Sequence, residues 1–284
     1  MILFKKITIS GVAAMLLLAL SLPSRAQWPY EVPFVPSPQV VVDEMLRLAA
    51  VTKDDFVIDL GSGDGRILIT AARKFGARGL GVDLDENLIF QSEEFAKQAG
   101  VAGRVEFLRQ DLFKTDLTRA TVITMYLLPG VNMRLRPVLL GLKPGTRIVA
   151  HDFDLGDWRP DVKVTIRKNA MLWIVPAEIS GRWRLQLPLP AGAQTWELNI
   201  RQKYQEIDGV VRVADRPPGG LWQPSLRGDK VSFVLVDNTD RDNEANLYFE
   251  GVVNGGVMEG ELRRGVGETQ TRHRWRAERI SPQP

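Results

Sequence analysis

A buried apolar run that turns directly into a glycine-rich loop limits the possible folds of this chain more than any other feature. Residues 56–60 read Phe-Val-Ile-Asp-Leu, and three glycines follow at alternate positions, Gly61, Gly63 and Gly65. Glycine permits tight turns and lets a ligand approach the backbone closely. A helical apolar pattern begins immediately afterwards. A strand, a glycine loop and a helix in this order predict the first unit of a parallel sheet that binds a nucleotide-like ligand.

The alternation of strand and helix patterns continues to about residue 180. Strands are expected at 56–60, 79–83, 105–109, 121–125 and 146–151, and helices at 39–50, 67–75, 86–98 and 132–142. Two further runs, 163–167 and 171–175, are expected to close the sheet. Because the links are short, the helices should cover both faces of a mostly parallel sheet. The sequence therefore predicts an α/β fold with a Rossmann-like sheet.

The pattern changes at Gly181. From there to the C-terminus no helical period occurs, and short alternating runs such as Trp196, Leu198 and Ile200 are separated by turn signals. About eight strands are expected, which is typical of a small antiparallel barrel or sandwich. We therefore divide the chain into a leader at 1–26, an α/β domain at 27–180 and an antiparallel β domain at 181–284.

A short motif opens the β domain. It reads Gly181-Arg-Trp183, and several arginines occur near the end of the chain. In lipocalin-like barrels an early Gly-x-Trp packs against an arginine of the last strand, and this segment resembles theirs. The resemblance implies either a ligand cavity or a packed barrel. The alternative is that Arg272, Arg274 and Arg276 form a solvated face.

Two observations distinguish the possible ligands of the glycine loop. The dinucleotide fingerprint requires its third glycine where this chain has Arg66. A pyrophosphate also needs free N–H groups, but Asp59 and Asp64 flank the loop and their charge repels phosphate. S-adenosylmethionine has no phosphate and carries an ammonium and a sulfonium, which suit these acids. The alternative role for both acids is helix capping.

Two more acids follow the next strands at the same edge of the sheet. Asp83 lies 22 residues beyond Gly61, where a carboxylate can accept from both ribose hydroxyls. Asp111 follows the third strand, where it can accept from the adenine amino group. Capping of the next helix is the alternative for Asp83. We predict that S-adenosylmethionine is bound by Asp59, Gly61, Ser62, Gly63, Asp64, Gly65, Asp83, Leu84, Asp111 and Leu112.

The N-terminus has the three-part pattern of a secretory signal peptide. Lys5 and Lys6 precede an apolar stretch at 7–22, and Ser24-Arg25-Ala26 offers small residues where a signal peptidase cleaves. The stretch is short for a spanning helix, which needs roughly 20 residues. We expect cleavage near Ala26 and a periplasmic mature chain. The alternatives are a membrane anchor that leaves the catalytic domain in the cytoplasm, or a buried helix.

Charge and composition exclude several classes of function. Residues 27–180 carry 19 basic and 20 acidic side chains, and residues 181–284 carry 15 and 14, so the excess positive charge lies in the leader. A basic footprint for nucleic acid is therefore absent. The absence of cysteine excludes disulfides and a cysteine nucleophile. No metal-ligand spacing, serine triad or P-loop occurs, and we expect neither a metal nor a nucleic-acid partner.

Four segments carry a family resemblance: Val35-Pro-Ser-Pro38, Asp59-Leu-Gly-Ser-Gly-Asp-Gly-Arg66, Tyr126-Leu-Leu-Pro129 and His151-Asp-Phe-Asp154. Together they resemble the small membrane-associated protein-lysine methyltransferases, whose mitochondrial members modify the c subunit of ATP synthase and the adenine nucleotide translocase. The resemblance covers residues 32–177. The glycine loop is shared by many methyltransferases, whereas the other three segments are more particular.

The resemblance implies S-adenosylmethionine as the cofactor and a protein lysine, membrane proteins included, as the substrate. It further implies that Tyr126 and the proline-rich segment, with Phe34, Pro36 and Ser37, face the methyl group. This chain differs from the family in its leader, which also allows membrane association, and in its additional β domain.

Methyl transfer from a sulfonium is an in-line displacement, so the acceptor must present a lone pair in a site shielded from water. A lysine amine, with a reference pKa of about 10.4, must first lose a proton. The sulfonium charge and a dry pocket lower that pKa, which makes a strong base optional. Tyr126, His151 and Asp152 end the fourth and fifth strands at the ligand-binding edge, and we predict that they are catalytic. Packing of Tyr126 and a structural role for His151 are the alternatives.

Three hypotheses about function follow. The leading one is methyl transfer from S-adenosylmethionine to a protein lysine. The second is a methyltransferase acting on a small molecule or lipid. The third is a non-catalytic envelope protein whose β domain binds a ligand or partner, since a fold does not fix a function. The acidic glycine loop argues against the third.

Overall fold

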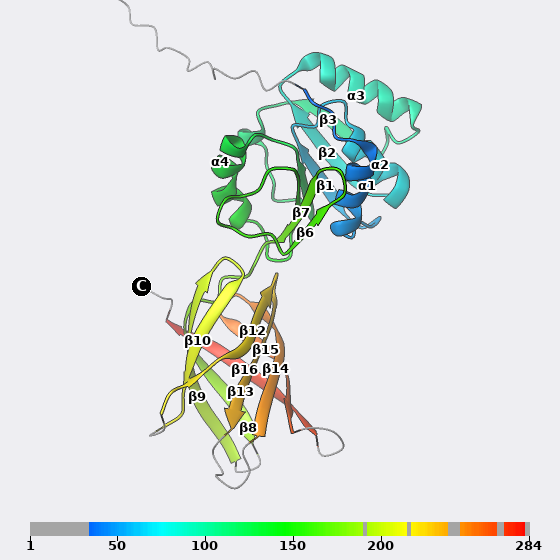
Figure 1. Ribbon diagram of the computed structural model, residues 1–284. Coiled ribbons are helices and arrows are strands. Elements are labelled where there is room, and N and C mark those ends of the chain that lie inside the picture. The colour runs from blue at the N-terminus through cyan, green and yellow to red at the C-terminus, as the bar shows by residue number, and fades with distance from the viewer. Residues whose placement is uncertain (1–33, 190–191, 215–216, 238–244, 266–269, 282–284) are drawn as a thin grey trace, which may run out of the picture. The chain divides into compact units, whose positions relative to one another are not determined.

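The computed structural model describes residues 34–189, 192–214, 217–237, 245–265 and 270–281, and the predicted leader lies outside the described residues. The described chain forms two sheets, shown in Figure 1. Each sheet has its own hydrophobic core. The boundary expected at Gly181 coincides with the first residue of the second sheet.

The first sheet has seven strands in the order β3-β2-β1-β4-β5-β7-β6. Five of them run parallel: β1 (Phe56–Leu60), β2 (Arg78–Asp83), β3 (Val105–Arg109), β4 (Val122–Met125) and β5 (Arg147–His151). Of the closing strands β6 (Val162–Thr165) and β7 (Asn169–Ile174), β7 pairs antiparallel with both β5 and β6. The predicted Rossmann-like fold is confirmed. The strand order reverses between β1 and β4, and ligands of such sheets bind beyond the carboxyl ends of the strands at that point.

The helices cover both faces of this sheet (Figure 1). They are α1 (Gln39–Leu48), α2 (Arg66–Phe75), α3 (Glu86–Gln98) and α4 (Pro129–Leu140), with a short 3-10 helix η1 (Leu112–Lys114). Successive side chains of a strand point to opposite faces. Accordingly Val57 packs in the core that contains residues of α1, α2 and α3, whereas Ile58 packs in the core that contains Leu135 of α4.

The apolar spacing placed the start of α4 at residue 132, but the helix begins at Pro129. Proline is favoured at the first helical position, because its fixed φ suits the helix and its missing N–H would have no partner there. The helix therefore reaches closer to the carboxyl end of β4 than the sequence pattern indicated.

The second sheet has nine antiparallel strands in the order β11-β10-β9-β8-β16-β15-β14-β13-β12. Their bounds are β8 (Gly181–Leu189), β9 (Gly192–Lys203), β10 (Glu206–Arg212), β11 (Gly219–Gly220), β12 (Trp222–Arg227), β13 (Lys230–Asp237), β14 (Ala245–Asn254), β15 (Val257–Arg264) and β16 (Thr271–Ser281). The sheet curves into a nearly closed barrel (Figure 1), so the barrel and not the sandwich is the outcome.

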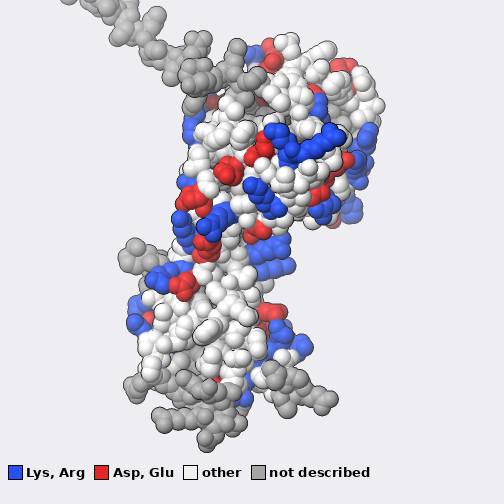
Figure 2. Space-filling model, viewed as in Figure 1, with Lys and Arg blue, Asp and Glu red and all other residues white. Residues whose placement is uncertain are grey.

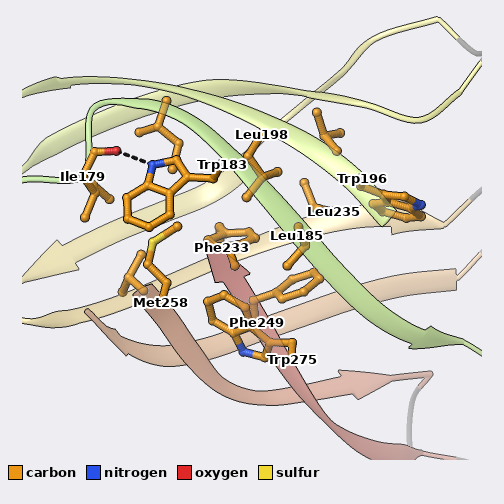
Figure 3. Close-up of a cluster of buried hydrophobic side chains, with 14 of the residues drawn as sticks. Ile179, Trp183, Leu185, Trp196, Leu198, Phe233, Leu235, Phe249, Met258 and Trp275 are labelled. Atoms are coloured by element: carbon orange, nitrogen blue, oxygen red, sulfur yellow. Dashed lines mark hydrogen bonds between the residues drawn. The ribbon is translucent and has the colours of Figure 1, made fainter. Parts of the chain in front are cut away.

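Aromatic side chains fill the barrel (Figure 3). Phe233 and Phe249 stack with their ring centroids 4.7 Å apart, and the Trp275 ring meets both edge-on. Gly251 makes room for this indole, because a Cβ at that position would lie 2.5 Å from Trp275. Trp275 Nε1 donates to Glu250 O at 3.1 Å, which satisfies its one buried polar group. These rings belong to the buried hydrophobic core of the barrel.

The motif at the start of the barrel makes the contact that its lipocalin-like resemblance implied. The Arg279 guanidinium of β16 lies 4.4 Å from the centroid of the Trp183 ring. Arg279 also donates to Ser180 O and Glu178 O, and Trp183 Nε1 donates to Ile179 O at 2.8 Å. These bonds fasten the first strand of the barrel to the last. Two arginines earlier in β16 pair instead with glutamates, Arg272 with Glu261 and Arg276 with Glu259.

Contacts of the turn between β9 and β10 join the barrel to the α/β region. The Tyr204 ring stacks on Trp158 with centroids 5.9 Å apart. Trp158 Nε1 donates to Gln205 Oε1 at 2.9 Å. Trp158 itself is fully buried and belongs to the core under α4.

These contacts yield a prediction about the α/β region alone. A fragment of residues 34–180 should fold, because β7 closes the sheet and the two cores beneath it are complete. It should also bind S-adenosylhomocysteine. Trp158 should become more accessible than in the full chain, because Tyr204 and Gln205 are missing. Circular dichroism, calorimetric titration and acrylamide quenching of tryptophan fluorescence measure the three properties. A soluble fragment that does not bind S-adenosylhomocysteine would show that the barrel completes the site.

Candidate active site

The glycine loop between β1 and α2 has a backbone that only glycine adopts easily. Gly61, Gly63 and Gly65 have φ values of 75°, 53° and 76°, in the left-handed region. A Cβ at Gly61 would lie 2.8 Å from Leu127, and one at Gly63 would lie 2.3 Å from the Phe34 ring. The three glycines are therefore required by both backbone conformation and space.

Four N–H groups of this loop donate to acceptors within the protein. Gly61 N and Ser62 N both donate to Val82 O at 2.9 Å. Gly63 N donates to Asp83 Oδ2 at 2.9 Å, and Gly65 N donates to Ser62 O at 2.9 Å. A phosphate-binding loop needs N–H groups that point at the ligand. This loop instead offers carboxylates, which supports the argument for a cationic ligand without phosphate.

Asp59 is the acid at the centre of the site. Its Oδ1 accepts from Thr124 Oγ1 at 2.7 Å, while its buried Oδ2 has no hydrogen-bond partner among the described residues. Burial raises the pKa of Asp59 to about 7, and the nearby carboxylates of Asp83 and Asp64 add to the rise. A bound cation would favour the ionised carboxylate.

Asp64, in contrast, is committed to a neighbour. Arg66 Nη2 pairs with its carboxylate at 2.6 Å, and Arg66 Nη1 donates to Ser37 O at 2.9 Å. The Asp64 charge is therefore compensated, and its contribution is to fix Arg66. Through Arg66 the glycine loop holds the proline-rich segment that precedes α1.

Asp83 at the end of β2 does not cap the next helix, because the N-cap of α3 is Asp85, whereas Asp111 after β3 is the N-cap of η1. Asp83 Oδ1 accepts from Asp85 N at 3.1 Å, and Asp111 Oδ1 accepts from Phe113 N at 3.0 Å at the start of η1. Each carboxylate oxygen has a second lone pair, so these bonds leave acceptors for hydroxyl or amino groups of a ligand. Leu84 is exposed beside Asp83, and Leu112 is half-buried.

S-adenosylmethionine fits this donor set. Besides Asp59 Oδ2, the buried Ser62 Oγ lacks a hydrogen-bond partner among the described side chains and backbone. Asp59 and Ser62 would hold polar groups of the amino-acid part, Asp83 the ribose, and Asp111 the adenine. The excess of acceptors over free donors suits an ammonium and a sulfonium.

A long-range hydrogen bond connects two of the residues predicted on the acceptor side of the site. Ser37 Oγ lies 2.7 Å from His151 Nδ1, and both side chains are buried. The Tyr126 ring lies against the imidazole with centroids 3.9 Å apart. Burial lowers the pKa of His151, so the ring is neutral at neutral pH. The structure thus brings together Ser37, Tyr126 and His151, at the carboxyl ends of β4 and β5.

The other predicted residues lie around this group. Asp152 has a left-handed backbone with φ of 65° and pairs with Lys168 at 2.8 Å. The hydrogen bond from Lys168 lowers the pKa of Asp152, which makes the carboxylate a weak base and points to a role in holding the loop. Phe34 covers Gly63, while the Pro36 side chain is exposed.

Two residues near the site were missed from the sequence. Arg66 ends the glycine-loop segment, and its spacing gives no sign of the bond to Ser37 O. Asn132 in α4 is fully buried and bonds to the loop after β5, with Nδ2 donating to Asp154 O at 3.1 Å. The sequence signal for Asn132 is a polar amide that lies three residues after Pro129 and between apolar residues.

No cluster of potential metal ligands occurs among the described residues. The helices of the described ranges also include none with the length and apolar character needed to span a bilayer.

Known proteins are similar to this chain in sequence and fold. Residues 59–162 match the ANTKMT methyltransferase domain. A protein-lysine N-methyltransferase from Saccharolobus islandicus (strain REY15A) is 42% identical over 142 residues, which cover 49% of this chain and 88% of that protein. The Mus musculus lysine N-methyltransferase of the ATP synthase c subunit is 34% identical over 130 residues, but these are 45% of this chain and 52% of the mouse protein. The chain thus spans about half the length of that mammalian relative.

A solved structure extends the comparison to the bound cofactor product. The crystal structure of an RNA methyltransferase from Salinibacter ruber in complex with S-adenosyl-L-homocysteine has a TM-score of 0.50 and 52% identity. The match covers 51% of this chain and 96% of that chain. The acid-lined loop and these likenesses define an S-adenosylmethionine-dependent methyltransferase. More particularly, the chain belongs to the protein-lysine N-methyltransferase family represented by the Saccharolobus protein.

The environment of Asp59 predicts that ligand binding depends on pH. Below its pKa of about 7 the free protein holds a proton on Asp59, and the ammonium group of the ligand, which S-adenosylhomocysteine shares with S-adenosylmethionine, must displace it. Affinity for S-adenosylhomocysteine should therefore fall as pH decreases from about 7 to about 5, by up to about tenfold per unit. Calorimetry in buffers of different ionisation enthalpy measures both the affinity and the released proton.

Asp59→Asn should remove this pH dependence, whereas Asp85→Asn, at an exposed helix cap, should keep it. Stability provides a second measure. Because the folded protein binds the Asp59 proton more tightly than the unfolded chain, Asp59 makes the free energy of unfolding decrease from about pH 4 to about pH 7. If the affinity of the wild type for S-adenosylhomocysteine did not change between about pH 5 and about pH 7, the role of Asp59 would be contradicted.

Proposed function

We propose that this chain transfers the methyl group of S-adenosylmethionine to the side-chain amine of a protein lysine. The observation that carries the proposal is the Ser37–His151 contact beside the Tyr126 ring. It joins the proline-rich segment to the end of β5, next to the acid-lined loop. The protein-lysine methyltransferases among the relatives support the same substrate class.

The bound cofactor supplies an electrophilic methyl group. The protein must then deliver a lysine amine with a free lone pair. The Tyr126 ring can guide the incoming ammonium by a cation–π contact. Burial around His151 disfavours the charged amine and so promotes loss of its proton. The neutral imidazole adds no positive charge that would repel the substrate. Positioning and exclusion of water, not a strong base, are the contributions of these residues.

RNA is the second candidate substrate, because the Salinibacter structure is described as an RNA methyltransferase. Charge favours the protein substrate. Residues 27–180 carry 19 basic and 20 acidic side chains, and basic and acidic groups are interspersed on the face shown in Figure 2. Binding to a nucleic-acid backbone depends on neutralising phosphates with clustered Lys and Arg.

The lysine proposal is tested with methyl-labelled S-adenosylmethionine and separate protein and RNA fractions from cells that lack this chain. Label should enter protein, and acid hydrolysis should release Nε-methylated lysine. Tyr126→Leu should keep affinity for S-adenosylhomocysteine and lower turnover by about tenfold, because the aromatic ring that guides the ammonium is lost. Tyr248→Leu, a matched change in the barrel, should keep the turnover of the wild type. Label found only in RNA would refute the lysine assignment.

We also propose that the chain is exported and cleaved near Ala26, and that its substrates include membrane proteins. Support comes from the Lys5-Lys6 charge before the apolar stretch and from the Ser-x-Ala pattern after it. The alternative is an uncleaved anchor with the catalytic domain in the cytoplasm. S-adenosylmethionine, a polar cation made in the cytoplasm that does not cross a bilayer unaided, favours that alternative.

N-terminal sequencing of the protein from its native host decides between these locations. Export predicts a mature chain that begins near Gln27. Protease should then digest the domain when it is added to cells that have lost the outer membrane but keep an intact inner membrane. A retained Met1 on a chain that resists this protease would overturn export and leave the anchored form.

A further inference from the structure

Two buried polar atoms near the proposed acceptor position have no assigned role. His151 Nε2 and Asn132 Oδ1 are both without a hydrogen-bond partner among the described residues. His151 is 2% exposed and Asn132 is 1% exposed. Buried polar atoms are nearly always satisfied, so a protein that keeps two unsatisfied acceptors in its active site has a reason for each.

The orientation of the Asn132 amide is fixed by its partners. Nδ2 donates to Phe153 O at 3.2 Å and to Asp154 O at 3.1 Å. Both partners are carbonyl oxygens, which only accept, so the amide nitrogen must face them and Oδ1 must face away. These carbonyls belong to the second and third residues after His151. Asn132 Oδ1 and His151 Nε2 therefore lie around the same carboxyl end of β5.

The imidazole of His151 can also act as an acceptor. If Nδ1 carries the ring proton and donates it to Ser37 Oγ, 2.7 Å away, then Nε2 has a free lone pair. Burial lowers the pKa of His151 and keeps the ring neutral, as this tautomer requires. The contact with the Tyr126 ring holds the imidazole in place.

We propose that Asn132 Oδ1 and His151 Nε2 accept the two N–H groups of the neutral lysine amine. This inference rests on the proposed lysine substrate. With both N–H groups held, the remaining lone pair of the amine is directed toward the methyl group. The nitrogen–carbon bond forms as the carbon–sulfur bond breaks, the electron pair of the broken bond stays on sulfur, and the methylated ammonium then releases a proton to solvent.

The number of N–H groups on the amine makes the proposal specific. An unmodified lysine amine has two, a monomethylated amine has one, and a dimethylated amine has none. An acceptor that binds N–H groups should therefore matter most for the first methyl transfer and least for the third. A residue that only supports the loop should matter equally for all three.

The experiment measures kcat/KM of the full chain on three matched pools of synthetic peptides. Each peptide has one central lysine with randomised flanks, and the lysine is unmodified, monomethylated or dimethylated. Asn132→Ala should lower kcat/KM by about 10- to 100-fold on the unmodified pool, less on the monomethylated pool and about threefold or less on the dimethylated pool. His151→Phe, which keeps a ring against Tyr126, should show the same gradation.

Arg136→Ala is the matched control on the same helix. Arg136 Nη1 donates to Leu155 O at 3.1 Å, so it anchors the same loop without presenting an unsatisfied acceptor. Its effect should be equal on the three pools. Binding of S-adenosylhomocysteine identifies folded variants, and if Asn132→Ala fails this check, the His151→Phe series decides.

Equal losses on the three pools for the folded acceptor variants would overturn the acceptor pair and leave the lysine function standing. A wild type that methylates none of the three pools would overturn the lysine function and the acceptor pair together.

Discussion

The end of β2 holds the glycine loop through its backbone and through one side chain, and the rest of the site depends on this contact. Val82 O accepts from two successive loop N–H groups, and the Asp83 carboxylate accepts from Gly63 N. Because these donors are used internally, the loop presents acids to its ligand. A strand–loop–helix unit that could cradle phosphate is thereby suited to an ammonium and a sulfonium. The buried Asp59 adds a carboxylate whose pKa of about 7 leaves it sensitive to a bound cation.

The loop also organises the acceptor side. Asp64 fixes Arg66, Arg66 holds the backbone of Ser37, and the Ser37 hydroxyl meets His151 at the end of β5. Cofactor loop, proline-rich segment and acceptor site are therefore one connected hydrogen-bond network. A change at Arg66 should therefore alter the position of His151, although Arg66 begins α2 and His151 ends β5. Networks of this kind position side chains more rigidly than isolated contacts do.

The barrel is held together by contacts of its own. Its first and last strands pair, Arg279 covers Trp183, and glycine replaces larger residues where the Trp275 indole crosses the interior. These aromatic rings belong to the hydrophobic core of the barrel. Its contacts with the α/β region converge on Trp158, which lies in the core beneath α4.

Local rules were enough to predict the α/β fold, the antiparallel β region that follows it and the acidic character of the glycine loop. Those rules are side-chain periodicity, the choice of turn residues, and the sign of charge next to a backbone turn. The pairings that build the site come from the assembled structure instead: Arg66 neutralises Asp64, Ser37 meets His151 across 114 residues, and Asn132 turns its oxygen away from the loop that it anchors. Such pairings depend on which groups become neighbours when the strands assemble, and local spacing carries no information about a hydrogen-bond partner on another element.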